Sequence, residues 1–313
     1  MSDPAINVDG LVKLFTRRGQ PPVRAVDGLC FRVEPGVIFG LLGPNGAGKT
    51  TTLRILTTLT TPTAGVAQVA GYDVVAAPLE VRRRIAVVIQ ASAAELLLST
   101  RENLLTFARF HGLSGQELRR RADRVLEQLG LTEEANRKVQ DLSGGFRRRV
   151  QVAKIFMVDT PVVFLDEFST GMDPILKRSL MHALQEEAHR GRTIVLTTHI
   201  LSEAEELCDD ILIMNRGRQV ARGDLTSLKL LSQGVYEVTI AFDELPAGID
   251  SALAALRPLR SSVNGHTIEI ALKEEESRVL DLAAGLARLG HVRHVDLSGA
   301  SLEDVFIELM EES

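Results

Sequence analysis

The feature that most restricts the fold is a glycine-rich loop at residues 43–50, which fits the pattern G-x-x-x-x-G-K-[ST] throughout. An apolar run, Val37–Leu42, precedes the loop, and residues 49–59 have helical spacing. A strand, a tight turn and a helix N-terminus together direct backbone N–H groups at phosphate oxygens, so the pattern predicts a nucleotide-phosphate site. The residues of this predicted phosphate loop and its continuation are Gly43, Pro44, Asn45, Gly46, Ala47, Gly48, Lys49, Thr50 and Thr51.

Two side chains of the phosphate loop suit a magnesium–nucleotide complex. Lys49 has the length and charge to reach β- and γ-phosphates. The Thr50 hydroxyl is a suitable ligand for Mg²⁺, which keeps water molecules in the rest of its shell. A chance glycine-rich turn is the alternative, and the strand and helix expected on either side disfavour it.

A pair of carboxylates follows a second apolar strand. Val162–Leu165 is wholly apolar, as in strands buried on both faces, and Asp166 and Glu167 come directly after it. In a parallel sheet such strand ends lie beside the phosphate loop. We therefore expect Asp166 to hold the Mg²⁺ shell and Glu167 to orient or deprotonate the attacking water. A solvated acidic pair at a strand end is the alternative.

Two further polar residues also follow apolar strands. His199 comes after the strand at residues 193–197, and a histidine there could hydrogen-bond a γ-phosphate. Gln90 ends the strand expected from Ile85, and its amide oxygen could join the metal or water shell. Taken alone, each could equally be a polar residue at a strand end.

A second anion site is expected where Leu142-Ser143-Gly144-Gly145 opens a helix that extends to Met157, with Ser143 as its cap. With this feature, the order of motifs resembles the nucleotide-binding subunits of ABC transporters over roughly residues 4–230. That family shows a phosphate loop, a glutamine loop, an LSGGQ signature, an acidic strand, an aspartate loop and a switch histidine. The matching positions here are Gly43–Thr50, Gln90, Leu142–Phe146, Val162–Glu167, Gly171–Asp173 and His199.

The resemblance implies ATP as the nucleotide, Mg²⁺ as its metal, and hydrolysis with Glu167 and His199 as catalytic residues. It implies that Thr50, Gln90 and Asp166 serve the metal. Two copies would pack head to tail, so that the signature of one copy meets the γ-phosphate on the phosphate loop of the other. Besides the phosphate loop and Gln90, the residues implied to contact ATP are Phe15, Leu142, Ser143, Gly144, Gly145 and Asp173.

Three positions depart from the family pattern. Phe146 replaces the usual glutamine of the signature, and we expect little loss because the serine hydroxyl and the glycine donors remain. Phe168 stands where a proline often follows the catalytic glutamate, which changes the local rigidity. Phe15 stands where a tyrosine often stacks on adenine, and it keeps the aromatic face while losing the hydroxyl.

Residues 99–104 and 301–306 resemble the drug-resistance (daunorubicin-type) exporter branch, in which the ATPase is separate from its permease. The resemblance implies a second copy of the chain and a transmembrane permease as partners, and a peripheral position at the cytoplasmic face of the membrane. An importer ATPase with a regulatory C-terminal domain is one alternative, and a soluble ABC ATPase of DNA repair or translation is another. The long coiled-coil insertions, zinc modules or second cassette of the latter are not evident.

The expected fold is α/β, a P-loop NTPase of ABC type over residues 1–230, followed by a small α+β module over 231–313. The first part should contain an antiparallel β subdomain, a parallel-sheet core and a helical subdomain at about 92–157. The second part has the order β-α-β-β-α-β, which predicts a ferredoxin-like module.

Composition and charge indicate which partners and which compartment the protein has. The net charge of -5 disfavours a nucleic-acid partner, and the arginine runs at 119–121 and 147–149 predict solvated helix faces. No signal peptide is evident, and no stretch approaches the roughly 18 apolar residues of a membrane span. Another chain is therefore expected to supply any membrane path. The two cysteines lack metal-site spacing and favour a reducing compartment.

Overall fold

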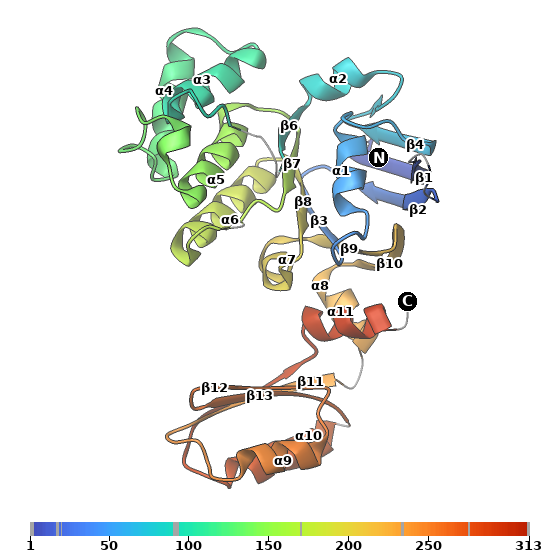
Figure 1. The fold of residues 1–313 in the computed structure, drawn as a ribbon, viewed down its shortest axis with the longest axis vertical. Coiled ribbons are helices and arrows are strands. Elements are labelled where there is room, and N and C mark those ends of the chain that lie inside the picture. Colours follow the sequence, from blue (N-terminus) through green and yellow to red (C-terminus); the bar gives the residue numbers. More distant parts are fainter. Residues whose placement is uncertain are drawn as a thin grey trace. The chain divides into compact units, whose positions relative to one another are not determined.

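The computed structural model describes residues 3–16, 19, 21–89, 94–169, 171–232, 235–274 and 276–311. The chain divides into two compact units, Met1–Arg222 and Gly223–Ser313, and Figure 1 shows the elements of each. Within the described residues, no helix is long and apolar enough to cross a bilayer.

A six-stranded sheet forms the centre of the first unit, in the order β10-β9-β3-β8-β7-β6. Every neighbouring pair from β9 to β6 is parallel. All residues of β3, β7 and β8 are buried, as expected for short apolar strands covered on both faces. The strands are β3 (Ile38–Leu42), β6 (Ile85–Val88), β7 (Val162–Asp166), β8 (Thr193–Thr198), β9 (Asp210–Asn215) and β10 (Arg218–Gly223).

A second, antiparallel sheet lies in the same unit, in the order β2-β1-β4-β5. Its buried side chains share one core with helix α1 (Lys49–Leu56) and strand β3, for example Leu11, Leu53 and Phe39. The same core includes Ala47, so the antiparallel sheet and the phosphate loop pack into one core. The strands are β1 (Ile6–Phe15), β2 (Val23–Val33), β4 (Ala64–Val69) and β5 (Tyr72–Asp73).

The helices of the first unit include a group formed by α3, α4 and α5 in Figure 1. A capping box at Ser99 and Glu102 starts α3, and the Ser143 hydroxyl caps α5, as the sequence predicts. The helix expected to reach Met157 ends at Ala153 and continues as a 3₁₀ turn. The helices are α1 (Lys49–Leu56), α2 (Pro78–Arg83), α3 (Thr100–Phe110), α4 (Gly115–Gln128), η1 (Val139–Asp141), α5 (Gly144–Ala153), η2 (Lys154–Met157), α6 (Pro174–His189) and α7 (Leu201–Leu207).

The second unit contains a four-stranded antiparallel sheet in the order β12-β13-β11-β14. One face packs Val238, Ile240 and Phe242 against helices α9 and α10. This order in a β-α-β-β-α-β chain confirms the expected ferredoxin-like module. The elements are α8 (Leu225–Lys229), η3 (Leu230–Ser232), β11 (Val235–Phe242), α9 (Ile249–Leu256), β12 (Arg260–Asn264), β13 (Thr267–Lys273), α10 (Glu276–Ala287), β14 (Val292–Gly299) and α11 (Leu302–Glu311).

The second unit begins at Gly223, ahead of the boundary that the sequence places after residue 230. Asp224 caps α8 by accepting a hydrogen bond from the Ser227 amide at 2.7 Å. The Ser232 hydroxyl donates to Glu308 of α11 at 2.6 Å. Residues 223–232 are therefore bonded into the C-terminal unit, although their composition gave no sign of it.

Candidate nucleotide site

The phosphate loop joins the end of β3 to the start of α1, as the sequence predicts. Gly48 is the N-cap of α1 with φ 106°, a backbone angle that residues with a side chain rarely adopt. A Cβ at Gly43 would lie 2.3 Å from the Met214 carbonyl oxygen, and one at Gly48 would lie 2.4 Å from that of Ala25. The backbone of the loop therefore lies directly against β9 and β2, and only glycine fits at these two positions.

Lys49 lies across the loop that precedes it. Its Nζ donates to the Gly43 carbonyl at 2.6 Å and to the Pro44 carbonyl at 3.1 Å. Burial lowers the pKa of Lys49, and the charges of Glu167 and Asp166 act in the opposite direction. The amine is thus a buried cation whose carbonyl partners are of a kind that phosphate oxygens could replace.

Asp166 ends β7 beside the first turn of α1. Its Oδ1 accepts hydrogen bonds from the Thr197 hydroxyl at 2.5 Å and from the Thr50 hydroxyl at 3.3 Å. The other oxygen, Oδ2, is buried and has no hydrogen-bond partner among the described residues. A buried carboxylate oxygen without a donor, next to a hydroxyl, fits a hard cation such as Mg²⁺. Thr197 was not singled out in the sequence, although it lies in the strand that leads to His199.

Glu167 and His199 face each other at adjacent strand ends. Glu167 Oε1 lies 3.2 Å from His199 Nδ1, and the Glu167 amide donates to the Thr197 carbonyl at 3.0 Å. Glu167 has φ 49°, a left-handed conformation that costs about 1–3 kcal/mol for a residue other than glycine. Non-glycine residues held in this way are concentrated at active sites.

A hollow of about 570 Å³ brings the phosphate loop, Glu167 and His199 together. Its volume lies within the usual range of about 300–1,000 Å³ for small-ligand pockets. Besides those two residues, its lining residues are Val23, Ala25, Asn45, Gly46, Ala47, Gly48, Lys49, Thr50 and Thr51.

The signature residues do not line this hollow within the described part of the chain. Ser143 caps α5, and a Cβ at Gly145 would lie 2.9 Å from the Gly171 carbonyl oxygen. Asp173 caps α6 and lies 3.6 Å from the Arg149 guanidinium. Gly145 thus lies against Gly171 and Asp173 lies near Arg149, while Leu142, Ser143 and Gly144 precede Gly145 at the start of α5.

The remaining expected residues lie at the edges of the site or outside the described chain. Phe15 is 43% exposed and pairs in register with Val23, which lines the hollow. Gln90 lies outside the described residues. Phe168 is fully buried, and Phe146 stacks under the Arg149 guanidinium at 4.5 Å.

The prediction of a solvated face for the arginine run 147–149 is wrong for Arg148, which is 7% exposed. Its guanidinium donates to the carbonyls of Asp166, Glu167 and Phe168. Three adjacent arginines point in different directions on a helix, so their spacing in sequence did not indicate which of them is buried.

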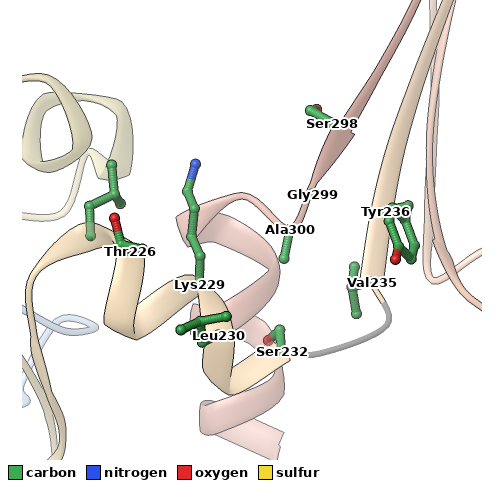
Figure 2. Close-up of a pocket in the computed structure, with 10 residues that line it drawn as sticks. Thr226, Lys229, Leu230, Ser232, Val235, Tyr236, Ser298, Gly299 and Ala300 are labelled. Carbon is green, nitrogen blue, oxygen red and sulfur yellow. The ribbon is translucent and has the colours of Figure 1, made fainter. Parts of the chain in front are cut away.

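A larger hollow, of about 710 Å³, lies in the second unit (Figure 2). There, Thr226, Lys229 and Leu230 from the helical segment face Ser298, Gly299 and Ala300 at the end of β14. It contains none of the predicted site residues and no glycine-rich helix start. We therefore assign the nucleotide site to the smaller hollow, because the phosphate loop, Glu167 and His199 line it and its smaller volume does not count against it.

Comparison with known proteins agrees with this site. The family profile described as "ABC transporter" matches residues 26–170, which include the phosphate loop, the signature and both carboxylates. A daunorubicin resistance ATP-binding protein of Streptomyces coeruleorubidus is 37% identical over 305 residues, covering 97% of this chain and 92% of that protein. The chain belongs to the ABC transporter family, as one of its ATPase subunits. The earlier resemblance is therefore confirmed.

Other relatives of this ABC ATPase include a Nod factor export ATP-binding protein of Ralstonia nicotianae, which is 37% identical over 98% of this chain and 94% of that protein. Among solved structures, an ATP-binding subunit of an ABC transporter has a TM-score of 0.66 at 29% identity, covering 72% of this chain and 92% of its own. A dimeric cassette in a post-hydrolysis state, bound to ADP and Pi, has a TM-score of 0.66 at 25% identity, covering 70% and 98%.

Proposed function

We propose that this ABC ATPase binds ATP–Mg²⁺ between two copies of itself and drives a separately encoded membrane permease that exports a hydrophobic compound. The observation that carries the proposal is the meeting of the phosphate loop, Asp166 and the Glu167–His199 pair around one hollow. The names of the relatives, which include drug-resistance and Nod factor exporters, support export.

The residues of this site would divide the work of hydrolysis. The glycine backbone and Lys49 would bind the β- and γ-phosphates, and Phe15 would stack on adenine. Thr50, Asp166 and Gln90 would hold Mg²⁺ or its waters, and the bound metal would neutralise charge on the phosphates. Glu167 would orient the attacking water and accept its proton, while His199 would contact the γ-phosphate.

The signature would complete the site of the second copy. Ser143 has its hydroxyl at a helix start, with Leu142 before it and Gly144 and Gly145 after it, and Asp173 caps α6; none of these residues lines the hollow of their own chain. A dimeric relative bound to ADP and Pi supports this arrangement. Binding ATP more tightly in the closed pair than in the open one would drive closure, and hydrolysis would reverse it. The subunit would work at the cytoplasmic face of the membrane through its permease.

The dimer is tested with Glu167→Gln. We expect this variant to bind ATP–Mg²⁺ with only a small residual rate of hydrolysis and to sediment as a dimer, because a pair that hydrolyses slowly stays closed. Glu186→Gln, at a half-buried position on α6 outside the site, is the matched control and should remain active. A Glu167→Gln protein that stays monomeric at saturating ATP–Mg²⁺ would contradict the composite site.

The phosphate loop is tested separately with Lys49→Ala. We expect calorimetry to show no ATP binding, because the buried amine is the loop's side-chain cation for the β- and γ-phosphates. Unchanged affinity would remove the phosphate-binding role from this loop.

A further inference from the structure

Arg148 lies on α5 but directs its guanidinium at the strand end that carries both carboxylates. Nε donates to the Phe168 carbonyl at 3.1 Å, and Nη2 donates to the carbonyls of Asp166 and, at 2.8 Å, Glu167. Nη1 donates to the Gln151 amide oxygen at 2.6 Å and to the Ile89 carbonyl at 3.5 Å. One buried side chain thus binds three successive carbonyls.

These carbonyls flank Glu167, a strained residue of the site. Glu167 is left-handed, and its own amide is already fixed by the Thr197 carbonyl at 3.0 Å. With Arg148 on the carbonyl side, the Glu167 backbone is held on both sides. A strained backbone conformation persists only where surrounding contacts hold it in place. Here the Thr197 carbonyl holds the amide of Glu167, and the Arg148 guanidinium holds its carbonyl.

The type of side chain matters for this contact. A guanidinium is a planar fork of five N–H donors, whereas a lysine amine is a point charge that cannot span three carbonyls in fixed directions. Burial lowers the pKa of Arg148, while the charges of Asp166 and Glu167 raise it. Arg148 therefore hydrogen-bonds the main chain of Asp166 and Glu167 and also interacts with the charges of their side chains.

We propose that Arg148 is a positioning residue for ATP hydrolysis, which fixes the backbone of Glu167 and thereby the direction of its carboxylate. This inference rests on the role of Glu167 in the proposed function. Arg148 lies on α5, the helix that Ser143 caps. It therefore also connects the signature helix to Glu167, the proposed general base, within one copy of the chain. Movement of α5 would then reach Glu167 directly.

Arg192, which directly precedes β8, provides a matched control at the other end of β7. It is 8% exposed and donates to the Thr160 and Ile155 carbonyls at 2.9 and 3.1 Å, with Glu187 as its ion pair. Thr160 precedes β7, so Arg192 holds the end of the strand that is remote from the carboxylates. Both arginines stabilise the fold, but only Arg148 contacts the site.

The test compares Arg148→Gln with Arg192→Gln in the full-length chain. For Arg148→Gln we expect kcat to fall about 30- to 100-fold with the Kd for ATP–Mg²⁺ within about threefold, because small misplacements of catalytic groups have effects of that size. For Arg192→Gln we expect a lower Tm but a kcat within about threefold of the parent. Equal losses of kcat in both variants, or none in Arg148→Gln, would overturn the inference.

A double-mutant comparison separates positioning of Glu167 from other effects. In a Glu167→Gln background, Arg148→Gln should lower the residual rate by less than about threefold, because the group that Arg148 positions is already missing. A further drop as large as in the parent would show that Arg148 acts elsewhere. If Glu167→Gln alone hydrolysed ATP like the parent, the proposed role of Glu167 would fail, and this inference with it.

If Arg148→Gln does not fold, Arg148→Lys serves in the same comparisons. It keeps the positive charge and loses the fork, so we expect a kcat loss of about tenfold with unchanged ATP affinity. Full activity of the lysine variant would overturn the inference, since charge alone would then suffice.

Discussion

The first unit buries several positive charges, and their partners differ. Lys49, Arg148 and Arg192 bind main-chain carbonyls, and Arg192 also pairs with Glu187. Lys154 is 8% exposed, and its amine lies 5.8 Å from the centre of the Phe107 ring. Burial lowers the pKa of Lys154 to about 8, while Glu95 acts in the opposite direction. The protein therefore carries a charge that costs stability at neutral pH.

Lys154 predicts a rise in stability at alkaline pH. Its pKa is about 8 in the folded chain and 10.5 when unfolded, so the unfolded state binds more protons between these values. The free energy of unfolding of the first unit, in the parent relative to Lys154→Met, should therefore rise by roughly 3 kcal/mol between pH 7.5 and 10.5. Urea unfolding at both pH values measures this, with Lys138→Met at an exposed position as control. A pH-independent difference would contradict it.

At the level of elements, the start of α5 lies against the loop that carries Gly171. Gly144 and Gly145 are neighbours in the first turn of this helix, but their surroundings differ. An added Cβ at Gly144 would meet nothing within 4 Å, whereas one at Gly145 would lie 2.9 Å from the Gly171 carbonyl oxygen. The second glycine is thus required by the fold of the chain itself.

This difference predicts opposite effects of two alanine substitutions. Gly144→Ala should stabilise the nucleotide-free chain by about 0.5–1 kcal/mol, because alanine loses less entropy in a helix. Gly145→Ala should destabilise it by about 1 kcal/mol or more, because main-chain atoms must shift to admit the methyl group. Thermal unfolding of the two variants side by side decides the matter. Equal shifts of Tm in the two variants would show that the loop carrying Gly171 can move to admit the methyl group without loss of stability.

The sequence predicted those helices, strands and loops that contain a known motif or a clear periodicity of apolar residues. The phosphate loop, the acidic strand and the position of His199 after a neighbouring strand were predicted, because parallel strands bring their ends to one edge. The direct contact between Glu167 and His199 was not predicted. Helix α2 and strand β5 were missed because both are short and have weak periodicity. The burial of Arg148 was missed because a tertiary contact, and not local sequence, determines it.

At the level of the whole molecule, the two units have separate hydrophobic cores. One includes Leu11, Phe39 and Leu53, and the other includes Ile240 and Phe242. Each core is contiguous within its own unit. We therefore expect each core to melt separately, so that the chain has two unfolding equilibria.

Calorimetry should therefore resolve two unfolding transitions, of which only one responds to nucleotide. Since the phosphate loop belongs to the first unit, ATP–Mg²⁺ at about 100 times its Kd should stabilise that transition by about 2.7 kcal/mol and leave the other in place. Lys49→Ala should abolish the shift. A single transition that moves as a whole would show that the two units unfold together.

The close fit of Gly43 and Gly48 beneath neighbouring carbonyls has a consequence for kinetics. Because neighbouring main-chain atoms hold the phosphate loop in its conformation, we expect ATP binding to need no folding of this loop. Encounter with ATP should then proceed at a rate governed by diffusion and charge. Slow events in the cycle would arise later, when whole subunits approach or part.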